Sequence, residues 1–260
     1  MYAWKDPDPD GFPIGFYQKS WLVVCDFVCN YIKQIRKNLE TIEEVNMTDL
    51  VLIPKMNNPT YVSQFRLILL CNTVNFFCSK TIVNRLKIYI DDIISAFQTS
   101  FISGRNIQEN IIVAQEMMHT MNHMKGKTRA FVIKVDLNKA YDNLNWQFME
   151  KILNEVGIPN QIKRAIMNAI STVKMKVLWN RNDCNLFEIR KGLRQGDPIS
   201  PYIVVLCLDT LSHMIKAVVG NGNWIGLKAR MKGPMISHLM FENDLLLFGK
   251  ATNRHMVRIK

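Results

Sequence analysis

The feature that most constrains this chain is an apolar run that stops at an acid. Residues 130–137 read AFVIKVDL, which is typical of a buried strand, and Asp136 lies near its end. A carboxylate in that position is costly unless something pairs with it. Asp136 therefore either holds a cation or caps the helix that follows, and the sequence alone leaves both interpretations open. Asp142, which precedes a helical pattern starting at Trp146, is better explained as a helix cap.

A second acidic position lies at the tip of a predicted hairpin. Apolar arms within residues 236–248 flank Glu242, Asn243 and Asp244, and polar residues in such a turn are ordinary turn chemistry. Two acidic strand ends in one chain nevertheless favour a phosphoryl-transfer site, because that chemistry needs convergent carboxylates to hold Mg²⁺ ions. The chain has 33 Lys and Arg but only 22 Asp and Glu, and this positive charge modestly favours a polyanionic partner.

A third segment, with the sequence GLRQGDPISP, leads into an apolar helix. Gly196 would let a base or another backbone approach closely, because it lacks a side chain. Arg194 and Gln195 carry donors suited to bases or phosphates. The alternative is an ordinary helix start, in which Asp197 or Ser200 is the cap.

Hydrophobic spacing predicts a mixture of helices and strands, and therefore an α+β fold. Helices are predicted at residues 21–44, 76–94, 106–123, 146–156, 161–171 and 200–219. Strands are predicted at residues 51–54, 63–70, 130–137, 173–179, 186–190 and 224–229, followed by the hairpin at 236–248. We expect no membrane span, because no run of about 18 apolar residues occurs. The six cysteines are scattered without a CxxC pair, which favours a reducing compartment inside the cell, the cytoplasm or the nucleus.

Three of these segments resemble reverse-transcriptase motifs, and they occur in the order of motifs A, B and C. They are KVDLNKAYD at 134–142, GLRQGDPISP at 192–201 and FEND at 241–244. Further blocks resemble the finger region of LINE-type (non-LTR) retrotransposon enzymes and the segment before it, in particular those of plant genomes. These blocks lie at residues 9–21, 52–55, 65–72 and 98–105. Several ordered blocks together are far more specific than any one of them.

The resemblance implies a fold of fingers and palm, with an antiparallel palm sheet and helices packed on one of its faces. It places a leading segment and helix at residues 1–44, the fingers at 45–125 and the palm at 126–260, with the thumb missing. The implied activity is RNA-directed DNA polymerisation by two-metal nucleotidyl transfer. Mg²⁺ is the expected cofactor, and an RNA template, a DNA primer and deoxynucleotide triphosphates are the expected partners.

The resemblance also gives roles to individual residues. Asp136, the carbonyl of Leu137 and Asp244 match the metal site, and the two aspartates are the expected catalytic residues. The residues expected to bind the incoming nucleotide are Lys55, Arg66, Tyr141, Gln195 and Gly196. The residues expected to contact nucleic acid are Arg105 and Arg194.

The departures from the family pattern matter more than the matches. Motif C usually reads aromatic-Ala-Asp-Asp, whereas this chain has Glu242 at the alanine and Asn243 at the first aspartate, normally a metal ligand. A neutral amide removes a charge from a site that must balance divalent cations. In the fingers, Leu67 replaces a proline and Leu69 a small polar residue. We therefore expect impaired catalysis; the alternatives are an inactive nucleic-acid-binding remnant and a decayed, non-functional fragment.

Overall fold

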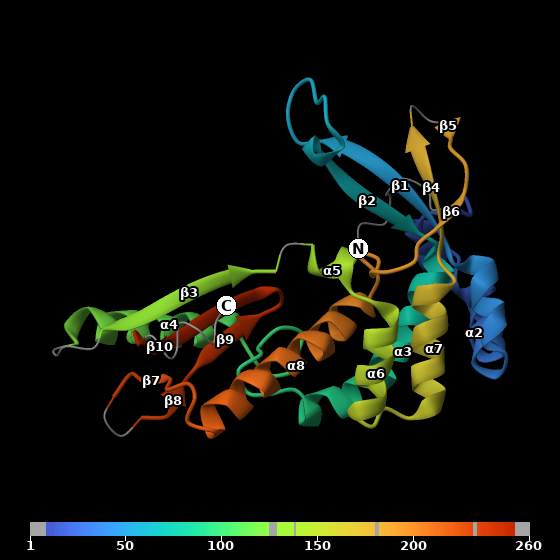
Figure 1. The fold of residues 1–260 in the computed structure, drawn as a ribbon. Helices are drawn as coiled ribbons and strands as arrows, with labels where there is room; N and C mark the ends of the chain where they lie inside the picture. Colours follow the sequence, from blue (N-terminus) through green and yellow to red (C-terminus); the bar gives the residue numbers. More distant parts are fainter. Residues whose placement is uncertain (1–8, 125–128, 138, 180–181, 231–232, 253–260) are drawn as a thin grey trace. The chain divides into compact units, whose positions relative to one another are not determined.

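The computed structural model describes residues 9–124, 129–137, 139–179, 182–230 and 233–252 (Figure 1). The chain forms two compact units, each assembled from two separated stretches. Unit 1 comprises residues 1–88 and 141–200, and unit 2 comprises residues 89–140 and 201–260. The boundaries predicted at residues 44 and 125 divide the chain into consecutive functional segments rather than compact units, so they remain a prediction.

The helices of unit 1 lie largely where hydrophobic spacing predicted them. They are α1 (Ile14–Lys19), α2 (Trp21–Lys37), the first part of α3 (Thr73–Ile93), α6 (Trp146–Glu155) and α7 (Asn160–Ser171). Two short 3₁₀ segments accompany them, η1 (Leu39–Val45) and η2 (Val62–Gln64). The single helix predicted at 21–44 was too long, because Asn38 has extended backbone angles that end α2. A buried cluster, which includes Val28, Ile35, Ile42 and Cys78, joins α2, η1 and α3.

Unit 1 also contains a mixed five-stranded sheet. Its strands are β1 (Met47–Pro54), β2 (Phe65–Cys71), β4 (Lys174–Trp179), β5 (Asn182–Asp183) and β6 (Phe187–Glu188). β1 pairs antiparallel with β2 and parallel with β4, and β5 and β6 both pair antiparallel with β4. β1 starts four residues earlier than predicted, because the polar Asp49 interrupts the apolar pattern and yet lies buried, 3.6 Å from the Lys176 ammonium.

Unit 2 is built on an antiparallel sheet with the strand order β3-β10-β9. Its strands are β3 (Ala130–Asp136), β9 (His238–Phe241) and β10 (Asp244–Lys250), and a separate pair consists of β7 (Leu227–Lys228) and β8 (Met235–Ile236). Its long helices are α4 (Ile107–His123) and α8 (Ser200–Gly220), whose first residue belongs to unit 1. The short helix α5 (Ala140–Asn143) spans the boundary between the units. These strands and helices confirm the α+β prediction.

The two faces of the unit 2 sheet are covered differently. Side chains alternate along a strand, so Val135 and Leu245 share one face, where Leu245 packs with Ile215 of α8. The opposite face carries Phe248, which packs with Met117 of α4. The prediction of helices on one face is therefore correct only at the end of the sheet that carries Asp136 and Asp244. At the other end α4 covers the second face.

Helix α8 is long and apolar enough to cross a membrane by length and composition alone, the only described helix that is. Core helices pass the same test, and 44% of the apolar window of α8 is buried inside the structure. Val204 and Val205 are completely buried, and Ile215 packs beneath the sheet. Its contacts are those of a core helix.

His238, at the start of β9, is fully buried in a polar network. Its Nε2 lies 2.7 Å from the hydroxyl of Ser212, and its Nδ1 lies 2.9 Å from that of Ser237. Burial, together with the positive charge of the nearby Lys216, lowers the pKa of His238 to about 4. The imidazole is therefore neutral in the folded chain at pH 7, and its protonation opposes folding.

We expect acid to destabilise unit 2 through His238. The unfolded histidine takes up a proton below about pH 6.5, whereas the folded one resists protonation down to about pH 4. The free energy of unfolding should therefore be unaffected above pH 6.5 and fall by up to about 3 kcal/mol as pH drops to 4. Urea melts across this range should show a shallower pH dependence in His238→Gln than in the exposed-histidine control His119→Gln. Equal slopes in the two variants would refute this account.

Candidate active site

The two predicted catalytic aspartates face each other across adjacent strands. Asp136 is the last residue of β3, Asp244 is the first residue of β10, and the antiparallel register pairs them directly. Directly opposed residues project to the same face of a sheet, with Cβ atoms about 4.5–5.5 Å apart. Their predicted juxtaposition at one end of the sheet is thus confirmed, although their chemical roles remain a proposal.

Each of these carboxylates already has a nitrogen partner from the chain. The Lys134 ammonium lies 3.0 Å from Oδ1 of Asp244. Lys134 is two residues before Asp136 on β3, so both project to the face that carries Asp244. The side-chain amide of Asn243 donates to Oδ1 of Asp136 at 3.4 Å. The cluster therefore contains two carboxylates, one ammonium and one amide.

The backbone places a strained residue beside this cluster. Glu242 and Asn243 form a two-residue turn between β9 and β10, and Glu242 has a φ of 53°. Hairpin turns with positive φ at the first position favour glycine, because a side chain there clashes with the backbone. The N–H of Glu242 donates to the hydroxyl of Ser100, which ties the strained turn to a distant segment.

We expect Glu242→Gly to stabilise the chain by about 1 kcal/mol, because glycine removes the cost of positive φ in this turn. The matched control is Glu242→Ala, which removes the carboxylate and keeps the strained backbone, so its stability should stay near that of the wild type. Denaturant unfolding curves give both values. An equal gain in the two variants would show that the charge of Glu242, and not its backbone, is the cause.

A segment that follows α3 holds the hairpin in place. The backbone N–H of Met240 donates to the carbonyl of Phe97 at 2.9 Å, and the Asn110 side chain donates to the Met240 carbonyl at 2.9 Å. Gln98 also forms a parallel bridge to Met240. Sequence reasoning did not identify Asn110, since an asparagine within a helical pattern carries no signal of a contact 130 residues away.

The predicted metal ligands are all oxygen donors, as Mg²⁺ prefers. The carbonyl of Leu137, however, already accepts a hydrogen bond from the Ala140 N–H at 3.1 Å, so only its second lone pair is free for a cation. Within the described ranges no group of three or more His, Cys, Asp or Glu side chains gathers where a metal could bind. The carboxylates that face each other here are therefore those of Asp136 and Asp244.

In unit 1, the backbone of Gly192 packs against the segment around Tyr141. Gly192 has a φ of +83°, and a Cβ there would lie 2.7 Å from the Asp142 carbonyl oxygen. The N–H of Leu193 donates to the Tyr141 carbonyl at 2.7 Å. Only glycine fits this close approach. Tyr141 itself is half-buried, so it is not a sealed core residue.

Gln195 and Gly196, the predicted motif B pair, are both exposed. Gly196 has a φ of +94°, and a Cβ added to it would meet nothing within 4 Å, so its backbone angles, and not crowding, require glycine. Gln195 lines a cavity of about 570 Å³. The apolar lining comes largely from one face of the sheet, which includes Leu50, Leu52, Leu67, Leu69, Met175 and Val177. Two of the departures from the family pattern thus line this cavity.

The structure contradicts the predicted role of Arg194. Its side chain is only 2% exposed and forms a 2.6 Å ion pair with Asp197. Its guanidinium also donates to the Thr48 hydroxyl at 3.3 Å and to the Ala169 carbonyl at 3.4 Å. A buried guanidinium that is engaged in this way does not contact nucleic acid. Arg194 ties together three separate stretches of unit 1 instead.

Arg105 is also engaged within its own unit. Its guanidinium donates to the carbonyls of Ile94, Ser95 and Gln98 at 3.0, 2.6 and 2.7 Å. These carbonyls belong to the segment directly after α3, where backbone acceptors lack helical partners. Arg105 therefore stabilises the segment that holds the hairpin, and its contact with nucleic acid remains a prediction.

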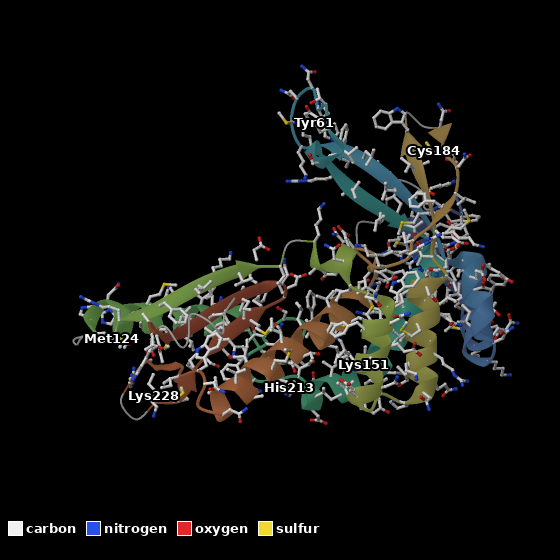
Figure 2. All side chains as sticks on the ribbon, in the orientation of Figure 1. Tyr61, Met124, Lys151, Cys184, His213 and Lys228 are labelled. Carbon is white, nitrogen blue, oxygen red and sulfur yellow. The ribbon has the colours of Figure 1, made fainter. Side chains whose placement is uncertain are left out.

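Lys55 and Arg66, the predicted finger cations, flank the loop between β1 and β2, and both are exposed. The Lys55 ammonium donates to the Ser63 carbonyl at 2.9 Å. Tyr61 is 70% exposed in the same loop and is labelled in Figure 2. The positions of both cations leave them accessible to a polyanion.

Solved structures of telomerase share this fold. The structure of telomerase from Candida albicans, in complex with a fragment of telomeric RNA, has a TM-score of 0.60 and 12% identity. The match covers 95% of this chain and 44% of the telomerase chain. Apo telomerase from Candida tropicalis without its C-terminal domain matches 83% of this chain and 46% of its own, with a TM-score of 0.59 and 12% identity. At such identities the likeness shows the fold alone, and it confirms the fingers-and-palm class.

The family model for reverse transcriptase (RNA-dependent DNA polymerase) matches residues 53–260. The chain therefore belongs to the reverse-transcriptase family. It is 25% identical over 214 residues to the uncharacterized 149 kDa protein of transposon TX1 from Xenopus laevis. It is 29% identical over 138 residues to the Pol polyprotein of the type-1 retrotransposable element R2 from Popillia japonica. These relatives confirm the predicted LINE-type reverse-transcriptase domain.

The matched regions cover 82% of this chain for the TX1 protein and 53% for the R2 protein. They cover only 16% and 22% of the respective relatives. This chain therefore spans a small part of the length of these relatives. The activities of the whole proteins belong to the proposal that follows.

Proposed function

We propose that this chain is the fingers-and-palm part of an RNA-directed DNA polymerase whose catalysis is impaired at Asn243. One observation carries the proposal: Asp136 and Asp244 are paired in register at the uncovered end of an antiparallel sheet. Membership of the reverse-transcriptase family supports the reaction type. Primer extension by the purified chain with Mg²⁺, an RNA template and a DNA primer tests it, and we expect a rate close to background.

Asp136 and Asp244 would hold Mg²⁺, with the free lone pair of the Leu137 carbonyl as a third oxygen ligand. When bound, the cation supplies Lewis-acid stabilisation of the transferring phosphoryl group. In motif C, Asn243 offers one neutral carbonyl oxygen, and it must first turn its amide nitrogen away from Asp136. The loss of a carboxylate and the competing donor both weaken cation binding at this turn.

The substrates are deoxynucleotide triphosphates. The accessible cations Lys55 and Arg66 suit a triphosphate, with Lys55 as a point charge and Arg66 as a planar guanidinium that can bind two oxygens. Tyr141, Gln195 and Gly196 are proposed to contact the incoming nucleotide, and their half-buried or exposed positions support this proposal. The RNA template and the DNA primer are the macromolecular partners.

We expect nucleic-acid affinity to fall steeply as salt rises, because phosphate contacts release condensed counterions. Replacing both Lys55 and Arg66 with methionine should lower the slope of log affinity against log salt by about 0.7–0.9 for each lost phosphate contact. Fluorescence anisotropy with labelled RNA at several salt concentrations gives this slope. The control is Lys151→Met, an exposed lysine on α6 labelled in Figure 2, which should leave the slope unchanged. An unchanged slope in the double variant would remove these residues from the nucleic-acid interface.

A second function is also open to this chain. Because Asn243 weakens the site, the chain could bind RNA without performing chemistry. Salt-dependent RNA affinity, with no extension even after motif C is repaired, would establish this alternative. A non-cooperative melt and ready proteolysis would instead indicate a fragment that does not fold.

A further inference from the structure

Lys134 is a charged group at the candidate site to which none of the motif matches gives a role. Its ammonium is 3.0 Å from Oδ1 of Asp244, closer than the 3.4 Å contact between the Asn243 amide and Asp136. The pairing register places Leu246 opposite Lys134 and Asp244 opposite Asp136, so Lys134 reaches Asp244 along the diagonal of the strand pair. Diagonal neighbours on one sheet face are within reach of long side chains.

We propose that Lys134 is a built-in cation of this site: it neutralises Asp244 in place of a second metal ion, so the cluster takes one divalent cation, centred on Asp136. The inference rests on the proposed function only in taking a divalent cation as the ligand. Asp136 and Asp244 are the two carboxylates paired directly across the strands, and the Lys134 ammonium offsets one of their two charges.

The position of Lys134 on the strand explains why the ammonium stays near the carboxylates. Lys134 and Asp136 lie on the same face of β3, and the opposite face of the strand is packed against α8 through Ile133 and Val135. A shift in register would move the lysine to that apolar face. The backbone of Lys134 is therefore fixed by the sheet, and its side chain, which is 64% exposed, reaches Asp244 at the open end of that face.

An ammonium at ion-pair distance has two effects on a divalent cation. It repels the cation directly, and it occupies one oxygen of Asp244 that would otherwise be a ligand. Both partners are partly exposed, so water and salt screen the interaction and keep it modest. We therefore expect removal of the Lys134 charge to tighten divalent-cation binding by about fivefold at low ionic strength.

Titration of the whole chain with Mn²⁺, followed by electron paramagnetic resonance of the free ion, tests this proposal. The wild type should bind one Mn²⁺ above the background that remains in Asp136→Asn. Lys134→Met should bind the ion about fivefold more tightly, whereas Lys134→Arg, which keeps the charge, should stay near the wild type. The matched control is Lys228→Met, an exposed lysine of β7 in the same unit, labelled in Figure 2, whose loss should not change the affinity.

Three results would overturn the proposal. They are two equivalent Mn²⁺ ions on the wild type, a Lys134→Met affinity within twofold of Lys228→Met, or no saturable binding in any variant. Circular dichroism melts check that each variant folds, and the charge-retaining arginine variant separates a loss of charge from a loss of structure. These outcomes are independent of polymerase activity, since primer extension and RNA affinity decide the proposed function separately.

Discussion

Replacing Arg194 with methionine should lower the free energy of unfolding of unit 1 by about 3–5 kcal/mol. Removal of one partner of a buried ion pair leaves the other charge buried without compensation. Asp197 is 3% exposed as a side chain and would lose its 2.6 Å partner, while the Thr48 hydroxyl and the Ala169 carbonyl would each lose a donor. Urea-induced unfolding, followed by circular dichroism, measures the change.

The control for this prediction is Arg190→Met, which removes an exposed arginine four residues earlier in the same unit. It should change stability by no more than about 0.5 kcal/mol. If Arg194→Met instead kept wild-type stability and lost RNA affinity, Arg194 would contact nucleic acid, as the sequence predicted.

Repair of motif C should produce the largest change in activity. The double variant Glu242→Ala with Asn243→Asp restores a carboxylate where the chain has an amide, and it should bind Mg²⁺ more tightly than the wild type. Loss of one such ligand weakens transition-state stabilisation by several kcal/mol, so we expect repair to raise the rate of primer extension by about 10³-fold. Isothermal titration with Mg²⁺ and a gel-based extension assay give the two values.

The two measurements separate the possible lesions. Equal Mg²⁺ affinity in repaired and wild-type chains would show that Asn243 is not the lesion. Tighter Mg²⁺ binding without extension would locate the damage elsewhere. Leu67 and Leu69, which line the cavity beside Gln195, are then the first residues to restore.

The pairing of Asp136 with Asp244 could be predicted from sequence because two strong local signals agree. Each aspartate ends or begins an apolar run of strand length, and each lies in a block whose order matches a polymerase family. Side chains alternate with a period of two along a strand, so a fixed register places both carboxylates on one face. The structure has this register.

The roles of Arg194 and Arg105 could not be predicted, because they depend on contacts between distant segments. Arg194 reaches Thr48, which is 146 residues away in the sequence, and its other acceptor, Ala169, is 25 residues away. The sequence of a loop does not show whether its arginine is exposed or buried. The packing of α4 on the second face of the sheet could not be predicted for the same reason, since the apolar stripe of a helix does not reveal which element it packs against.

The Lys134–Asp244 contact lies between these two cases. The sequence places Lys134 two residues before Asp136, and so on the same face of the strand. Only the pairing of β3 with β10 brings Asp244 within 3.0 Å of the lysine ammonium. The shared face of Lys134 and Asp136 could therefore be predicted from the sequence, whereas the contact with Asp244 could be identified only from the strand pairing in the structure.

We propose that Asp136 and Asp244 form a nucleotidyl-transfer site that Asn243 disables. The most direct test compares primer extension on an RNA template by the repaired chain and by the repaired chain that also carries Asp136→Asn. We expect the repaired chain to extend the primer at about 10³ times the wild-type rate, and extension to return to background when Asp136 is replaced. Equal extension with and without the Asp136 carboxylate would contradict it.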